Sequence, residues 1–225
     1  ITQNSVFNSL PTINHLEPLF FCHTLTFGQV DTIAPVNRLN IRVAPLAFLD
    51  FYSGIGYKIG AEIKPFKRFS ITGDFGGYFK NSNGRRNYSG YNLDFSLRYY
   101  LNKPFNGNPR CFLSLHYFYK EQSFDSSDSI DKANPSILAY HTQKYVSVIG
   151  VNFGLQRIYK KRLIFEVFAG LGVRFKKVNS TLSSEDYKKV EEFYWDSMSF
   201  HFLVKPGNFI YPNFNLGFRI GVILF

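Results

Sequence analysis

The chain has 225 residues, of which 26 are Phe and 15 are Tyr, and its formal net charge is +10 at pH 7. No run of 18 apolar residues occurs, which excludes helices that span a membrane. Five His and two Cys show no metal-ligand spacing, so we expect neither a metal site nor a cofactor.

The N-terminal segment carries part of a secretion signal. Residues 19–28 combine a short apolar core with the small residues Thr26 and Gly28 just before Gln29. Residues 1–18 contain no Lys or Arg, which fits the usual start of such a signal poorly. We therefore interpret 1–28 as a signal peptide or as an irregular N-terminal extension, and 29–225 as the folded domain.

Alternation of apolar and polar residues with a period of two predicts eight β-strands in the rest of the chain. The clearest is 163–175, where every odd position is apolar and the even positions include Glu166, Gly170 and Arg174. Thirteen residues are long for a soluble strand and sufficient for a tilted strand that crosses a bilayer. The predicted strands are 37–48, 55–63, 69–79, 91–99, 111–119, 145–155, 163–175 and 213–225.

The connections between these strands differ in length and charge. We expect two long ones, 121–143 and 179–211, the second holding a short helix at 184–195 capped by Ser184. Three compact ones carry basic residues and no acid. This asymmetry is typical of bacterial barrels and predicts that both termini lie in the periplasm. The basic residues are Lys64, Lys67, Arg68, Lys103, Arg110, Arg157, Lys160, Lys161 and Arg162.

Eight alternating strands, Tyr and Phe near the strand ends, and a last strand that finishes on Phe225 resemble the small outer-membrane β-barrels of the OmpA/OmpX type. The resemblance is one of pattern and covers residues 37–225. It implies an all-β fold: an eight-stranded antiparallel up-and-down transmembrane β-barrel in a Gram-negative outer membrane, with a long, partly helical loop between the last two strands. A soluble lipocalin-like ligand-binding barrel is the alternative, because half-buried strands of any kind alternate.

If the apolar positions face lipid, the alternate positions face the lumen of the barrel. Charged side chains in such a narrow interior must pair, since an isolated buried charge costs several kcal/mol. We expect a salt-bridged interior that closes the barrel to solutes. The predicted lumen residues are Arg42, Lys58, Glu62, Asp74, Asp94, Arg98, His116, Glu166, Arg174 and Arg219.

The last long connection is rich in aromatic residues for an exposed loop, and loops on a rigid scaffold commonly bind partners. We expect a non-enzymatic structural or binding component of the cell envelope that contacts outer-membrane lipids and another envelope protein or a surface ligand. Nucleic acid is not expected as a partner, because the basic and aromatic side chains alternate onto opposite faces. The candidate partner-binding residues are Tyr187, Phe193, Tyr194, Trp195, Phe200, Phe202 and Phe209.

A lipid-modifying enzyme that catalyses acyl transfer or deacylation is the competing hypothesis. Such an enzyme would place a His with a Ser and an acid near the outer rim of the barrel. The histidines available for this are His116, His141 and His201, and none belongs to a recognisable motif.

Overall fold

The computed structural model describes residues 38–45, 55–80, 86–101, 109–129, 137–183, 185–188 and 205–224. The chain divides into two units, Ile1–Thr32 and Ile33–Phe225. The first unit, and with it the predicted signal segment 1–28, lies outside the described residues.

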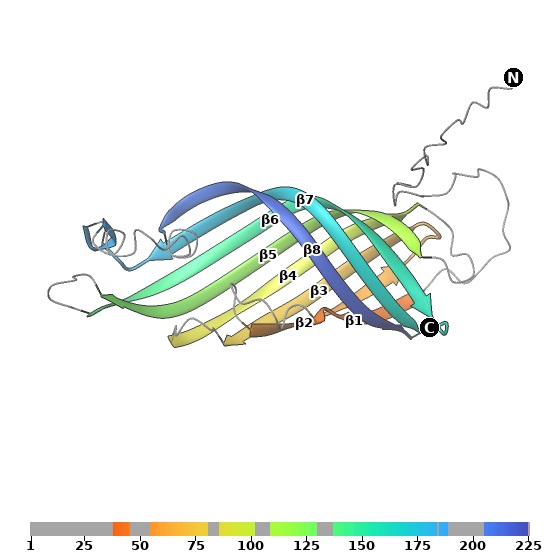
Figure 1. The fold of residues 1–225 in the computed structure, drawn as a ribbon, viewed down its shortest axis with the longest axis horizontal. Coiled ribbons are helices and arrows are strands. Elements are labelled where there is room, and N and C mark those ends of the chain that lie inside the picture. Colours follow the sequence, from red (N-terminus) through yellow and green to blue (C-terminus); the bar gives the residue numbers. More distant parts are fainter. Residues whose placement is uncertain are drawn as a thin grey trace, which may run out of the picture. The chain divides into compact units, whose positions relative to one another are not determined.

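The second unit is a closed antiparallel β-barrel, in which each strand pairs with the next and β1 pairs with β8 (Figure 1). The predicted all-β class and eight-stranded antiparallel order are confirmed. Among the described residues, no helix combines the length and the apolar character needed to cross a membrane. The strands are β1 (Arg38–Val43), β2 (Ile55–Lys64), β3 (Phe69–Lys80), β4 (Arg86–Tyr100), β5 (Arg110–Ser129), β6 (Ile137–Tyr159), β7 (Leu163–Ser180) and β8 (Gly207–Ile223).

The two faces of the sheet differ sharply in chemistry. Large apolar side chains point away from the barrel axis; Leu216 is 79% exposed and Leu171 is 64% exposed. Charged side chains point inward; Arg98 and Glu62 are each 1% exposed. Because successive side chains of a strand point to opposite faces, the period of two produces this separation directly.

The strands β5 and β6 continue well beyond the apolar band, which corrects the predicted loop 121–143. Their ladder is unbroken from the pair Glu121 and Tyr145 to the pair Ser129 and Ile137. We call residues 121–129 and 137–143 the outer extension. Here Phe124 and Tyr140 are buried on the inward side and most outward residues are polar, so the outward apolar period is lost. Figure 1 shows β5 and β6 projecting from one end of the barrel.

The connection between β7 and β8 is shorter than predicted, because β7 runs to Ser180 and β8 begins at Gly207. Residues 185–188 form one helical turn within it. The backbone N–H of Asp186 donates to Ser183 Oγ at 3.1 Å, so Ser183 caps this turn. The predicted cap, Ser184, and residues 189–195 lie outside the described residues.

The opposite end of the barrel has short hairpins. In the β6–β7 turn, Lys160 and Lys161 have φ values of 47° and 62°, as in turns of type I′. Of the basic residues predicted for the compact connections, Lys64 belongs to β2 and Arg110 to β5, and Lys103 lies outside the described residues. Lys64 and Arg110 lie over the ring of Tyr100, at 4.2 and 4.3 Å from its centroid.

Candidate functional site

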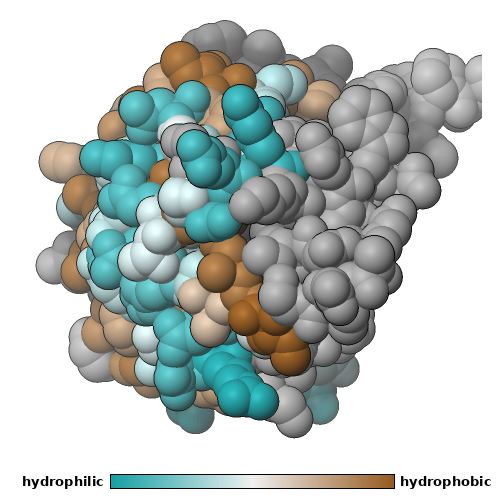
Figure 2. Space-filling model, turned by 90° about the vertical axis from the view of Figure 1, so that its left-hand side faces the viewer, coloured by the Kyte–Doolittle hydropathy of each residue, from teal (hydrophilic) through white to brown (hydrophobic). Residues whose placement is uncertain are grey.

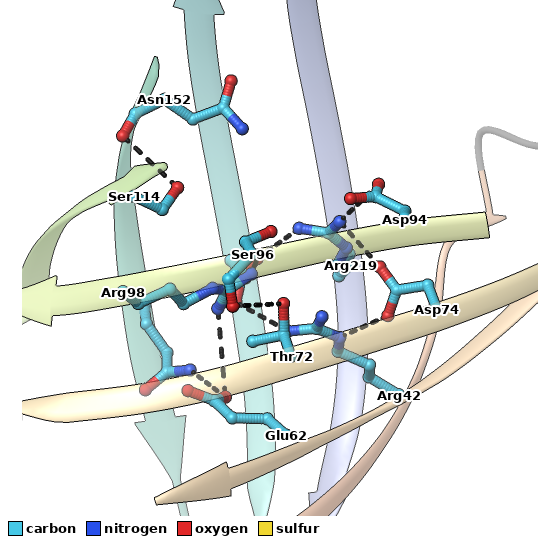
Figure 3. Close-up of polar contacts among 12 residues, drawn as sticks. Arg42, Glu62, Thr72, Asp74, Asp94, Ser96, Arg98, Ser114, Asn152 and Arg219 are labelled. Atoms are coloured by element: carbon cyan, nitrogen blue, oxygen red, sulfur yellow. Dashed lines mark hydrogen bonds and ion pairs between the residues drawn. The ribbon is translucent and has the colours of Figure 1, made fainter. Parts of the chain in front are cut away.

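The centre of the lumen holds a network of buried ion pairs (Figure 3). Glu166 pairs with two guanidinium groups in this network. Arg98 donates through Nη1 to Glu166 Oε2 at 2.6 Å and through Nη2 to Oε1 at 2.8 Å. Arg219 Nη1 also donates to Glu166 Oε1, at 2.9 Å. One carboxylate from β7 therefore joins guanidinium groups from β4 and β8.

Arg219 extends the network to β3 and β4. Its Nη2 lies 2.7 Å from Asp74 Oδ2 and 3.2 Å from Asp94 Oδ2. Arg42 on β1 donates through Nε to Asp74 Oδ1 at 2.8 Å. Asp74 thus links β3 to both β1 and β8, the two strands whose pairing closes the barrel.

Asp94 has two further partners in the lumen. Lys58 Nζ lies 2.5 Å from Asp94 Oδ2, and His116 Nδ1 lies 2.9 Å from Asp94 Oδ1. Counting these contacts, nine of the ten predicted lumen residues belong to one connected network. Apart from His116 it contains four cationic side chains and four carboxylates, so the ionic charges balance: Arg42, Lys58, Arg98 and Arg219 against Glu62, Asp74, Asp94 and Glu166.

Neutral side chains that the sequence did not single out complete the environment of Glu62. Its carboxylate accepts hydrogen bonds from the Tyr100 hydroxyl at 2.5 Å and from Gln156 Nε2 at 3.2 Å. Asn40 Nδ2 and Ser70 Oγ donate to it as well, at 3.2 and 2.5 Å. The alternation identifies such residues as inward-facing, but only the ladder register shows which carboxylate each one reaches.

Two aromatic rings fill the space between the guanidinium groups and the wall. Phe112 lies 4.5 Å from the Arg98 guanidinium carbon, and Phe168 lies 4.3 Å from that of Arg219. A Cβ atom added at Gly217 would stand 2.0 Å from Phe168 Cζ. Charged, polar and aromatic side chains therefore pack the centre of the lumen, as expected for a barrel of eight strands.

A cavity of about 330 Å³ lies on the outer-extension side of this network. Lys58, Asp94 and His116 line it next to the network, and Lys120 lines it further along β5. Arg174, the tenth predicted lumen residue, also lines the cavity and binds Asn213 Oδ1 through Nε at 3.0 Å and Nη2 at 2.6 Å. The lining of the cavity is mixed: it combines these charged groups with apolar side chains such as Phe118 and Val148.

The predicted partner-binding residues are described only in part. Tyr187 lies in the helical turn. The assignment of Phe209 to a loop was wrong: it belongs to β8, stacks on Tyr211 at 5.9 Å and lies under Lys176 Nζ at 5.4 Å. Phe209 lies at an inward position opposite Lys176 of β7, so the outward apolar period does not identify this part of the strand. The remaining candidates, Phe193, Tyr194, Trp195, Phe200 and Phe202, lie outside the described residues.

Comparisons with known proteins give one relationship. No curated protein and no solved structure matches the chain. A family described as "Protein of unknown function (DUF3575)" matches residues 52–200, a range that begins just before β2 and includes all of β3 to β7. The barrel and its ion network are therefore those of a chain that belongs to the DUF3575 family of proteins of unknown function.

Proposed function

We propose that the protein is an outer-membrane β-barrel of a Gram-negative bacterium, with a filled lumen and an outer end that binds an envelope partner or a surface ligand. The observation that carries this proposal is the exposed apolar band around a charged interior. A soluble lipocalin-like barrel has the opposite arrangement, with its apolar side chains packed inside. Lipid is the solvent that stabilises an apolar exterior.

The dimensions of the band support a membrane location. On β7 the outward apolar positions run from Leu163 to Phe175. Thirteen residues tilted by roughly 45° span about 30 Å, the thickness of the hydrocarbon layer. Near its outer edge lie Tyr91 and Tyr119, whose hydroxyls both donate to Glu121 Oε2. Such a belt of aromatic side chains is typical of the boundary between lipid and water.

The two ends of the barrel support an orientation. Bacterial barrels have short turns in the periplasm and longer segments outside the cell. Here the short hairpins lie at the end where β1 begins and β8 ends, because Leu224 N donates to Leu39 O and Ile223 N donates to Arg162 O. We therefore propose that the outer extension is extracellular and that both termini are periplasmic.

The filled lumen favours a binding role over conduction. Arg98 and Glu166 leave little space at the centre, and the cavity of about 330 Å³ lies on the outer-extension side of them. Figure 2 views that end, where hydrophilic side chains cover much of the described surface. A partner or ligand would meet the protein there, while outer-membrane lipids surround the apolar band.

The location is tested by outer-membrane fractionation and by the heat-modifiable gel migration of a folded barrel. The orientation is tested with single cysteines in a chain whose Cys22 and Cys111 are replaced by Ser. A maleimide on a large polyethylene glycol should label Ser127→Cys in intact cells, and Lys161→Cys only after the outer membrane is permeabilised. A chain in the soluble fraction, or the reverse labelling order, would overturn the proposal.

The binding role is tested by shortening the outer extension. Ser126 and Tyr140 are ladder partners, so a two-residue Asn-Gly turn can replace residues 127–139 without disturbing the barrel. After mild-detergent purification, a partner that contacts the extension should accompany the full chain and be absent from the shortened one. Heat-modifiable migration of both chains serves as the folding control. An unchanged partner in both preparations would exclude residues 127–139 as the binding surface.

A further inference from the structure

The outward face of the outer extension holds a serine, a histidine and an aspartate in mutual contact. His141 Nε2 lies 3.1 Å from Ser123 Oγ, and His141 Nδ1 lies 2.6 Å from Asp125 Oδ1. The hydroxyl and the carboxylate therefore occupy the two opposite nitrogens of one imidazole ring. Serine hydrolases on unrelated folds use this connectivity to activate a nucleophile.

The ladder register explains how two strands assemble this cluster. Ser123 and Asp125 are alternate residues of β5, so both point outward. His141 is the direct ladder partner of Asp125 on β6. The cluster thus sits on the two longest strands of the barrel, where the backbone is fixed by ladder bonds on both sides.

Two further hydrogen bonds orient His141 and Asp125. The His141 backbone N–H donates to Thr181 Oγ1 at 2.9 Å, which ties β6 to the end of β7. Asn87 Nδ2 donates to Asp125 Oδ2 at 2.6 Å, so both carboxylate oxygens of Asp125 have a partner. Asp125 is held facing the ring, as a residue that positions a catalytic histidine must be.

The cluster is open to a substrate. The side chains of His141 and Asp125 are 41% and 40% exposed, and Ser123 is half-buried. This separates them from the buried pair of His116 and Asp94, which belongs to the lumen network.

We propose that Ser123, His141 and Asp125 form a hydrolytic site for fatty-acyl esters at the outer surface of the membrane. The choice of a lipid substrate rests on the proposed membrane location. Ser123 lies two residues beyond Glu121, the carboxylate bound by the boundary tyrosines, which places it about 7 Å further along β5 and, at a tilt of roughly 45°, about 5 Å further from the lipid core. That distance is comparable to the roughly 5–7 Å thickness of one headgroup layer.

In the reaction, Ser123 Oγ attacks the ester carbonyl carbon and its proton passes to His141 Nε2. The carbon–oxygen bond to the leaving alcohol then breaks, and His141 returns the proton to that oxygen, which leaves an acyl ester on Ser123. Water attacks this ester with His141 again as the base, and Ser123 regains its proton as the fatty acid departs. The net reaction consumes one water and yields an acid and an alcohol.

The tetrahedral intermediate needs a donor to its oxyanion. Backbone N–H groups of central strands are committed to the ladders, so a side chain must provide that hydrogen bond. Gln143 is the direct ladder partner of Ser123, and its Oε1 accepts from the Tyr145 hydroxyl at 3.3 Å. We assign its amide nitrogen to the oxyanion, since amide side chains act as such donors in hydrolases.

A fluorophosphonate probe tests the nucleophile in the full chain refolded in detergent. Ser123→Ala should abolish labelling and His141→Gln should slow it by about six orders of magnitude, as loss of the base does in other triads. Ser127→Ala, on the same strand and face but outside the cluster, should label like the unaltered chain. Absence of labelling in the folded unaltered chain, or equal labelling of Ser123→Ala, would overturn the proposal. Folding is checked by heat-modifiable migration, so failure here is distinct from a wrong membrane location.

Ester hydrolysis tests the substrate class and the positioning role of Asp125. The unaltered chain should hydrolyse p-nitrophenyl palmitate in mixed micelles with a higher kcat/KM than the soluble acetate ester; a preference for the acetate would overturn the lipid assignment. Asp125→Asn should lower kcat about 10⁴-fold with little change in KM, and Asp125→Glu should restore part of the rate. An unchanged kcat in Asp125→Asn would exclude the aspartate from the site.

Discussion

Arg98 binds Glu166 through two parallel hydrogen bonds, 2.6 and 2.8 Å long, that cross the lumen from β4 to β7. These strands are not ladder neighbours, so the pair connects parts of the sheet that the backbone does not. Both side chains are 1% exposed. Fork-to-fork pairing of this kind combines strength with a fixed geometry.

Replacing Glu166 by Gln is expected to destabilise the barrel by about 3–5 kcal/mol, because Arg98 and Arg219 would each lose a charged partner while buried. The free energy of unfolding is measured by urea titration of the barrel in lipid vesicles. Glu185→Gln, at an exposed carboxylate in the helical turn, is the control and should change stability by less than about 0.5 kcal/mol. Equal effects of the two substitutions would contradict a structural role for the network.

Replacing Gly217 by Ala is expected to cost about 1–3 kcal/mol, since the new Cβ would collide with a Phe168 ring already held against Arg219. Gly73→Ala is the matched control, because its Cβ would meet Phe95 at an ordinary 3.5 Å. The same urea titration compares them. Adding Phe168→Leu to Gly217→Ala should recover part of the loss; no recovery would show that the collision is not the cause.

Replacing Leu171 by Arg is expected to destabilise the membrane-inserted barrel by about 2–4 kcal/mol, the cost of a lipid-facing Arg near the bilayer midplane. Leu171 is 64% exposed near the middle of the β7 band. Asn179→Arg, further along the same strand and on the same face, lies beyond the band and should be nearly neutral. The melting temperature of each variant is measured in lipid vesicles and again in detergent micelles without urea. Equal tolerance at both positions would argue against a lipid-facing band.

The contribution of Asp125 to stability should depend on pH. The hydrogen bond from His141, together with that from Asn87, lowers the pKa of the Asp125 carboxyl. Because the folded-state pKa is below the unfolded one, the stabilisation is complete above about pH 4 and is lost as the pH falls through the folded-state pKa. The ladder places Arg86 opposite Asp125 as the other charged neighbour.

Melting temperatures of the unaltered chain and of Asp125→Asn check this expectation by heat-modifiable migration. The unaltered chain should melt higher at pH 7 and at pH 5, and the difference should shrink below pH 4. A difference that persists unchanged into strong acid would mean that ionised Asp125 is not what stabilises the extension.

Much of the fold and of the central network was accessible from alternation alone. Asp74, Arg98 and Glu166 were recognisable because each interrupts an otherwise apolar or glycine-rich strand at an inward position. What alternation does not provide is register. The contact of Tyr100 with Glu62, or of Ser123 with His141, depends on how far one strand slides along another, and that is set by turns and side-chain packing.

The outer extension was missed for a different reason. The other strands are recognised by an apolar outward face and a polar inward face. In the outer extension the aromatic side chains Phe124 and Tyr140 lie on the inward face instead. Most outward residues of the outer extension are polar, so the rule that identifies the other strands fails there. Phe209 at the start of β8 was misassigned for the same reason.

Asp74 binds Arg42 from β1 and Arg219 from β8, so one carboxylate forms ion pairs with both strands whose pairing closes the barrel. A growing sheet that has not yet received β8 would hold Asp74, Asp94 and Glu166 without that guanidinium. Such a sheet would hold three cations against four carboxylates, and a buried charge without a partner costs several kcal/mol. The strand that closes the barrel thus also supplies the fourth cation that balances the four carboxylates of the network.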